Sequence, residues 1–225
     1  MLKSKISKEE LNLMPVVVFE GEITIVDELS KVQPAIAELR KSKIVGIDTE
    51  TKPNFTRGTH HKVSLVQIAT LHHCFLFRLN KIDFPPALAE FLADDHIRKI
   101  GLSLRDDFSG LNKHHVFIPG NSIDIQSIVH NYGIMELGLQ KIYAILFEKK
   151  ISKSQRLSNW ESPELSEQQQ RYAATDAWAC LQIYNRLMKE EKLSAPEIEK
   201  IKSQHALEIK EKQLSGKTDT GTVSM

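Results

Sequence analysis

The sequence has little cysteine and no excess of charge of either sign. Its 225 residues include only two cysteines, Cys74 and Cys180, far apart and in apolar settings. They lack metal-ligand or redox spacing, so we expect two reduced, partly buried thiols. The 30 basic and 29 acidic residues leave a net charge of +1. Any nucleic-acid site must therefore come from local charge or from bound metal.

Long apolar runs and internal repeats are also absent. No segment approaches the ~20 apolar residues that span a bilayer. The charged stretch Met1–Met14 does not read as a signal peptide, and a cytoplasmic location is expected. Since 41% of the residues are apolar, the chain can build a core. We predict one domain over residues 1–190, followed by a charged C-terminal extension, 191–225, partly helical and then disordered.

The apolar pattern predicts an α/β sandwich whose first strands form a hairpin and whose later strands are parallel. Residues 1–20 read as a short leader that ends in a possible edge strand. Short β-branched runs predict five strands, and 3.6-residue periodicity predicts the helices. The strands are expected at 44–48, 63–69, 74–77, 97–102 and 122–125, and the helices at 30–41, 85–92, 106–114, 138–147, 166–187 and 196–214.

Two pairs of residues, each with at least one carboxylate, fall at spacings that bring their side chains together. Asp48 and Glu50 are two apart at a strand end and so point to one side. Tyr172 and Asp176 are four apart in a helix and share one face. Taken singly, each pair also fits an ordinary solvated surface. Together, converging carboxylates repel one another and are costly to desolvate, so the pattern favours divalent cations between them.

A third acidic position follows Gly101, where Asp106 and Asp107 open a helix. Helix capping is the alternative interpretation for either residue. Adjacent histidine pairs, such as His60 and His61, do not share a face and are interpreted as loop residues.

Three motifs in this order resemble the DEDD superfamily of 3′–5′ exonucleases. The likeness is to the branch with tyrosine in the last motif, which includes ribonuclease D and the Werner helicase exonuclease domain. It runs from about Val16 to Leu187. The motifs are Ile44-Val45-Gly46-Ile47-Asp48-Thr49-Glu50, Ile100-Gly101-Leu102-Ser103-Leu104-Arg105-Asp106-Asp107-Phe108, and Leu157-Ser158-Asn159-Trp160 with Tyr172-Ala173-Ala174-Thr175-Asp176.

The resemblance implies an RNase H-like fold, with a mixed five-stranded sheet flanked by helices. It also implies two Mg²⁺ or Mn²⁺ ions held by Asp48, Glu50, Asp107 and Asp176. Phe108 and Leu111 follow in the family register, which selects Asp107 over Asp106. Tyr172 would orient the attacking water, because a phenol with a pKa near ~10 is a poor base at neutral pH.

The implied reaction removes 5′-mononucleotides from the 3′ end of DNA or RNA. A single-stranded or 3′-frayed strand would contact basic residues in two loops, namely Arg57, Lys62, Lys153 and Arg156. Plain solvated charge is the alternative interpretation of these loops. Two other functions stay open: a catalytically inactive nucleic-acid-binding module of the same fold, and an adaptor that binds a partner through its Lys/Glu-rich C-terminal segment.

Overall fold

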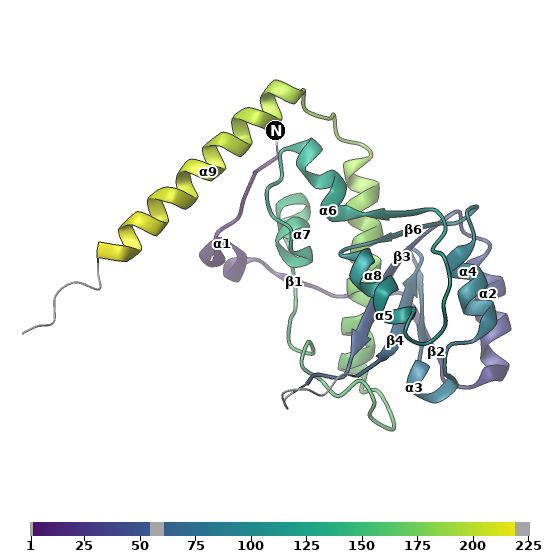
Figure 1. The fold of residues 1–225 in the computed structure, drawn as a ribbon. Helices are drawn as coiled ribbons and strands as arrows, with labels where there is room; N and C mark the ends of the chain where they lie inside the picture. Colours follow the sequence, from purple (N-terminus) through teal and green to yellow (C-terminus); the bar gives the residue numbers. More distant parts are fainter. Residues whose placement is uncertain (1, 55–60, 219–225) are drawn as a thin grey trace, which may run out of the picture.

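A mixed six-stranded sheet forms the centre of the chain in the computed structural model, which describes residues 2–54 and 61–218 (Figure 1). Its strand order is β2-β5-β4-β3-β6-β7, and a separate two-stranded sheet joins β1 and β8. The strands are β1 (Val16–Val17), β2 (Glu22–Val26), β3 (Ile44–Thr51), β4 (Val63–Ala69), β5 (His73–Phe77), β6 (Arg98–Gly101), β7 (Ser122–Asp124) and β8 (Lys150–Ile151).

Six described helices lie close to the positions that their periodicity predicts, and the short helices α1, α3 and α6 were not predicted. The α-helices are α1 (Lys8–Leu13), α2 (Val32–Leu39), α3 (Leu79–Ile82), α4 (Pro86–Ala93), α5 (Leu104–Leu111), α6 (Ile125–Ile128), α7 (Leu139–Phe147), α8 (Glu167–Leu187) and α9 (Ala195–Thr218). Two 3₁₀ turns are η1 (Leu29–Lys31) and η2 (Val129–Tyr132). None of these described helices has the length and apolarity needed to cross a bilayer.

Strand directions agree with the sequence expectation of a hairpin followed by parallel strands. β3, β4 and β5 are antiparallel neighbours, and β6 and β7 lie parallel on the other side of β3. The predicted count of five strands is wrong, because β2 pairs in parallel with β5 and makes a sixth. β2 carries the β-branched run Ile23-Thr24-Ile25-Val26, a strand signal that the sequence reasoning missed, although only Val26 of this edge strand is buried.

The edge strand expected at the end of residues 1–20 does not join the main sheet. β1 pairs in parallel with β8, where Val17 is the register partner of Ile151. The segment from 149 to 160, interpreted from its sequence as a loop, therefore begins with a short strand. Residues 215–218 belong to α9 rather than to the disordered tail predicted from residue 215. Residues 219–225 lie outside the described part of the chain.

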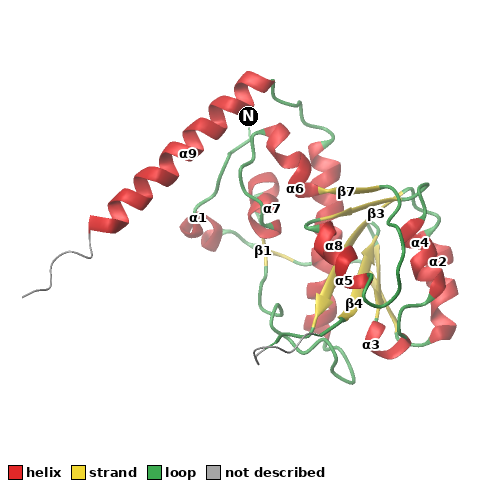
Figure 2. Cartoon of the chain, in the orientation of Figure 1, coloured by secondary structure: helices red, strands yellow, loops and turns green. Residues whose placement is uncertain are grey.

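Helices cover both faces of the main sheet (Figure 2). On one face, α2, α4 and α5 pack against residues such as Val45 and Ile47 of β3. On the other face, α8 packs along β3 and β4, through Ala173 and Ala177 among others. Residues of β3 alternate between these two layers, as in any strand with both faces covered. The alternation places the side chains of Asp48 and Glu50 on the α8 side.

Candidate metal and active site

The site begins at the end of β3, where the strand passes closest to α8. A Cβ atom at Gly46 would lie 1.9 Å from the carbonyl oxygen of Ala177, so a residue without a side chain is needed there. This approach brings the backbone of α8 against the strand two residues before Asp48. The next residue on the same face is Glu50.

The helix α8 supplies Tyr172 and Asp176 from successive turns. Its first turn is fixed by a capping box, in which the Ser166 hydroxyl accepts from the Gln169 N–H and the Gln169 side chain accepts from the Ser166 N–H. Asp48, Glu50 and Asp176 each place an oxygen within 4.8 Å of the others. Residues 48 and 176, far apart in sequence, thus meet at one point.

Asp107 approaches from the opposite side of β3. Thr49 points away from Asp48 and Glu50, and its hydroxyl donates a hydrogen bond of 2.5 Å to Asp107 Oδ1. The other oxygen, Oδ2, is buried and has no hydrogen-bond partner among the described residues. Its neighbour Asp106 is exposed. Asp107 stands outside the three-carboxylate group but close enough to raise the pKa values of Asp48 and Glu50.

The position of Asp107 depends on how α5 begins. Ser103 precedes the helix in a left-handed conformation, with φ 62° and ψ 33°. The carboxylate of Asp124 accepts hydrogen bonds from the backbone N–H groups of Ser103 (3.2 Å) and Leu104 (2.9 Å). It also caps α6 by accepting from Gln126 N–H. One side chain from β7 therefore holds the first turn of α5, which carries Asp107.

Burial is the largest cause that raises the pKa of each carboxyl group in the cluster. Neighbouring carboxylates raise the pKa further at Asp48, Glu50 and Asp107, whereas Tyr172 and Lys153 act against burial at Asp176. The pKa of Glu50 is raised to about 9, that of Asp176 to about 7 and that of Asp107 to about 6. The pKa of Asp48 is raised well above its ordinary value, chiefly by burial and then by Asp107. These carboxyl groups are therefore stable in their ionised form only when positive charge lies among them.

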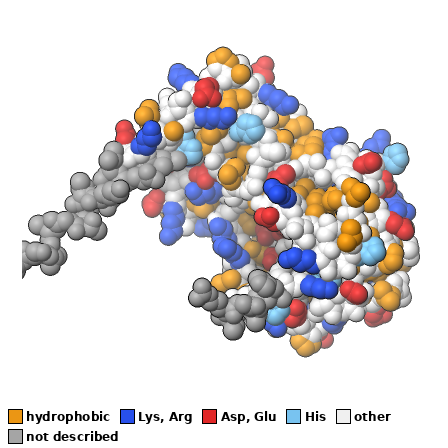
Figure 3. All heavy atoms as spheres, viewed as in Figure 1, with side chains coloured by type: hydrophobic (Ala, Val, Ile, Leu, Met, Phe, Trp, Pro, Cys, Tyr) orange, Lys and Arg blue, Asp and Glu red, His pale blue; other side chains and the backbone are white. Residues whose placement is uncertain are grey.

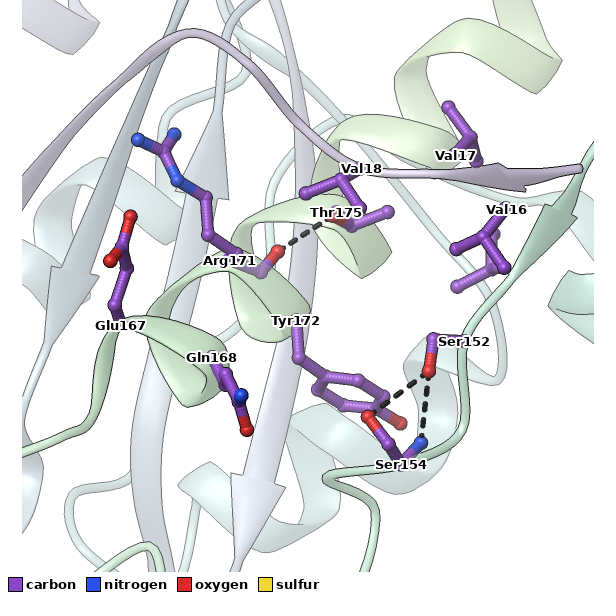
Figure 4. Close-up of a pocket in the computed structure, with 11 residues that line it drawn as sticks. Val16, Val17, Val18, Ser152, Ser154, Glu167, Gln168, Arg171, Tyr172 and Thr175 are labelled. Atoms are coloured by element: carbon purple, nitrogen blue, oxygen red, sulfur yellow. Dashed lines mark hydrogen bonds between the residues drawn. The ribbon is translucent and has the colours of Figure 1, made fainter.

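Tyr172 lies beside this cluster and also forms part of a neighbouring pocket (Figure 4). Burial and then Asp176 raise the pKa of its hydroxyl far above the ordinary value, so the phenol stays protonated. Its hydrogen bond to Asp176 lowers the pKa of that carboxyl. The pocket, of about 380 Å³, is walled by Val16, Val17 and Val18 of the N-terminal segment and by Ser152 and Ser154, toward which the ring points.

The predicted substrate-binding residues fall on both sides of the acidic cluster. Lys153 lowers the pKa of Asp176, and Arg156 lowers that of Glu50, so both cations lie within electrostatic reach. Lys62 lines a pocket of about 360 Å³ beside Asp107. Arg57 lies outside the described residues. In Figure 3, acidic side chains lie in a hollow near the centre of one face, with Lys and Arg side chains along its rim.

Several residues that shape the site escaped the sequence reasoning. Thr49 is the hydrogen-bond donor to Asp107, Asp124 caps α5, and Lys113 lines the same pocket as Lys62. Of these three residues, only Thr49 could have been suspected from the sequence, because it lies between two predicted ligands. Asp124 and Lys113 are distant in sequence from those ligands, and only the tertiary structure places them near the site.

The donor set fits divalent metal. Hard cations such as Mg²⁺ and Mn²⁺ prefer carboxylate oxygens, and three such oxygens converge here. The partnerless oxygen of Asp107 adds a fourth carboxyl close by. The individual residue roles given above stay predictions.

Comparison with known proteins identifies the family of this chain. A family model described as 3′–5′ exonuclease matches residues 23–192, and the chain belongs to that family, within the DEDD superfamily. A 3′–5′ exonuclease of Arabidopsis thaliana is 30% identical over 146 residues, which is 62% of this chain and 51% of that protein.

Two solved structures share the fold. The Nibbler EXO domain of Aedes aegypti has a TM-score of 0.68 at 24% identity, covering 78% of this chain and 91% of that one. Ribonuclease D of Trypanosoma brucei in complex with RNA U12 has a TM-score of 0.69 at 18% identity, covering 90% and 72%. The chain spans about half or less of the length of the first curated relatives it matches.

Proposed function

We propose that this chain is a metal-dependent 3′–5′ exonuclease that hydrolyses phosphodiester bonds and releases 5′-mononucleotides. The convergence of Asp48, Glu50 and Asp176 within 4.8 Å carries the proposal. Membership of the 3′–5′ exonuclease family supplies the reaction class.

The four acidic residues would form two cation sites. Asp48, Glu50 and Asp176 would hold one ion, and Asp107 together with Asp48 would hold the second. Bound Mg²⁺ or Mn²⁺ supplies an activated water and neutralises charge on the scissile phosphate. Thr49 keeps Asp107 oriented through the hydrogen bond to Oδ1, which leaves Oδ2 free to act as a ligand.

Tyr172 acts by orientation rather than by proton abstraction. Since burial and the neighbouring carboxylates hold its pKa far above neutral pH, the phenol is no base. The hydroxyl keeps its proton, donates a hydrogen bond to Asp176, and has lone pairs that can accept a hydrogen bond from the attacking water. The water is thereby aimed along one line toward phosphorus.

The substrate we propose is a single-stranded or 3′-frayed strand of DNA or RNA. Lys153 and Arg156 lie near the three-carboxylate group, and Lys62 and Lys113 flank Asp107. Cations on both sides of the metal ligands can contact phosphates on both sides of the scissile bond. A structural neighbour, ribonuclease D of Trypanosoma brucei, is known in complex with RNA. The cytoplasmic location stays a prediction.

The proposal is tested by digesting three 5′-labelled substrates in parallel: single-stranded RNA, single-stranded DNA and a duplex with a recessed 3′ end. We expect stepwise shortening with Mn²⁺ or Mg²⁺, none in EDTA, and recovery when metal is restored. The matched variant Asp48→Ala should fold and leave the substrates intact. Binding without shortening in all metals would favour the inactive module, and shortening in EDTA would contradict the metal site.

A further inference from the structure

A glutamine lies directly across the sheet from Asp48 with both of its polar atoms unpaired. Gln67 of β4 is the register partner of Asp48 in the antiparallel pair β3–β4. Its side chain is wholly buried, and neither Nε2 nor Oε1 has a hydrogen-bond partner among the described residues. A buried carboxamide without partners costs free energy comparable to lost hydrogen bonds. A buried carboxamide without partners is therefore a candidate for a functional role.

The surroundings of Gln67 leave few groups that could pair with it. Leu65 and Ala69, two residues away on either side, share its face of the sheet. They belong to an apolar cluster with Ala173 and Ala177 of α8. Leu76, its register partner on β5, belongs to the same cluster. Among the register partners of Gln67 on the two neighbouring strands, Asp48 alone is polar.

Register partners in an antiparallel pair point to the same face, with Cβ atoms about 5 Å apart. The two methylene groups of glutamine are long enough to span that separation, although Nε2 makes no hydrogen bond to the Asp48 carboxylate in this structure. Asp48 places a carboxylate oxygen within 4.8 Å of oxygens of Glu50 and Asp176, so as an anion it is repelled by both. A neutral N–H donor stabilises the charged form and adds no competing negative charge.

We propose that Gln67 is a positioning residue, whose unpaired carboxamide turns to donate an N–H hydrogen bond to Asp48 when metal binds and so holds that carboxylate as a ligand. The inference rests on the proposed function, since it assigns Gln67 to the metal site of that function. Gln67 touches no substrate. It works through Asp48, as groups behind metal ligands generally do by orienting the ligand and raising its affinity.

The test uses Gln67→Met, which keeps the shape and removes the amide. Without metal, this variant should melt a few degrees higher than the wild type, because the substitution removes an unpaired amide from an apolar cluster. Its affinity for Mn²⁺, measured by calorimetry or by electron paramagnetic resonance, should fall by about tenfold or more. Nuclease activity should return when the Mn²⁺ concentration is raised. A residue that only filled space would not give these opposite changes.

Two further variants sharpen the result. Leu76→Met alters the other register partner of Gln67 in the same cluster, and should leave Mn²⁺ affinity unchanged. Gln67→Asn keeps the amide but withdraws it by one methylene, and should also weaken Mn²⁺ binding. Unchanged affinity in both Gln67 variants, with the wild type binding Mn²⁺, would overturn the inference alone. A wild type that bound no Mn²⁺ would overturn the proposed function as well.

Discussion

Gly46 and Ala177 touch backbone to backbone, and a Cβ on the glycine would stand 1.9 Å from the carbonyl oxygen of the alanine. This contact sets the distance between β3, which carries two of the acidic residues, and α8, which carries the third. The geometry of the cluster is thus set right beside the carboxylates, since Ala177 directly follows Asp176 and Gly46 lies two residues before Asp48.

Gly46→Ala should push α8 away from the sheet. Overpacking costs about 1–3 kcal/mol in general, and the displaced Asp176 should weaken Mn²⁺ binding. Thermal melting and calorimetry would measure the two effects. The control is Gly138→Ala, since a Cβ there meets nothing within 4 Å. A Gly46→Ala protein with wild-type melting temperature and Mn²⁺ affinity would contradict this account of the site.

Asp107 and Asp106 are adjacent, and only the first should matter for catalysis. Asp107 is held by Thr49 and has a partnerless buried oxygen, whereas Asp106 is exposed. We expect Asp107→Asn to lower nuclease activity by more than ~10-fold, the scale on which metal-site partners act. Asp106→Asn should keep near wild-type activity. Equal losses in the two variants, measured on the same labelled strand, would refute the assignment.

The metal-free protein should lose stability as the pH rises. The pKa values of Asp107, Asp176 and Glu50 are raised to about 6, about 7 and about 9. Between pH ~5 and ~9 the folded state therefore holds protons that the unfolded state has released, and stability falls with pH by up to ~1.4 kcal/mol per proton and pH unit.

Melting curves in EDTA across this range test the sign of that dependence. Mn²⁺ should restore stability, more at pH 8 than at pH 6, because the ions bind the deprotonated groups. Asp48→Asn removes one of the repelling charges and should flatten the slope. A melting temperature that rose with pH in EDTA would show that the carboxyl groups are not held together as described.

Tyr172→Phe should separate chemistry from metal binding. The variant keeps the ring that lines the neighbouring pocket and loses the hydroxyl that aims the water. Misplacing a reactant costs on the order of 10²-fold in rate, while Mn²⁺ affinity should change little. Tyr143→Phe, which alters a buried ring stacked on Phe147, is the matched control. An undiminished turnover in Tyr172→Phe would remove the orienting role.

The positions of most elements and the two local pairs could be predicted because they rest on local periodicity, whereas the meeting of the two pairs was implied by the family resemblance. Alternation in β3 puts Asp48 and Glu50 on one face, and helical spacing does the same for Tyr172 and Asp176. The family register pointed to Asp107, whose burial beside Thr49 fits that choice.

What the sequence could not yield depends on contacts between distant segments. The parallel pairing of β2 with β5 sets Glu22 beside His73. The pairing of β1 with β8 joins residues 16 and 150. Asp124 holds α5 through backbone N–H groups about 20 positions earlier. No periodic pattern encodes such contacts, because each depends on how the whole sheet is assembled.

The pairing of β1 with β8 has a consequence for the basic segment that follows β8. That segment is anchored at one end by Val16 and Val17 and at the other by the capping box of Ser166. Lys153 and Arg156 thus lie beside the acidic cluster on a segment whose two ends are held in place. Val16 and Val17 thereby limit how far these cations can move near the acidic cluster, so removing β1 would alter that cluster from a distance.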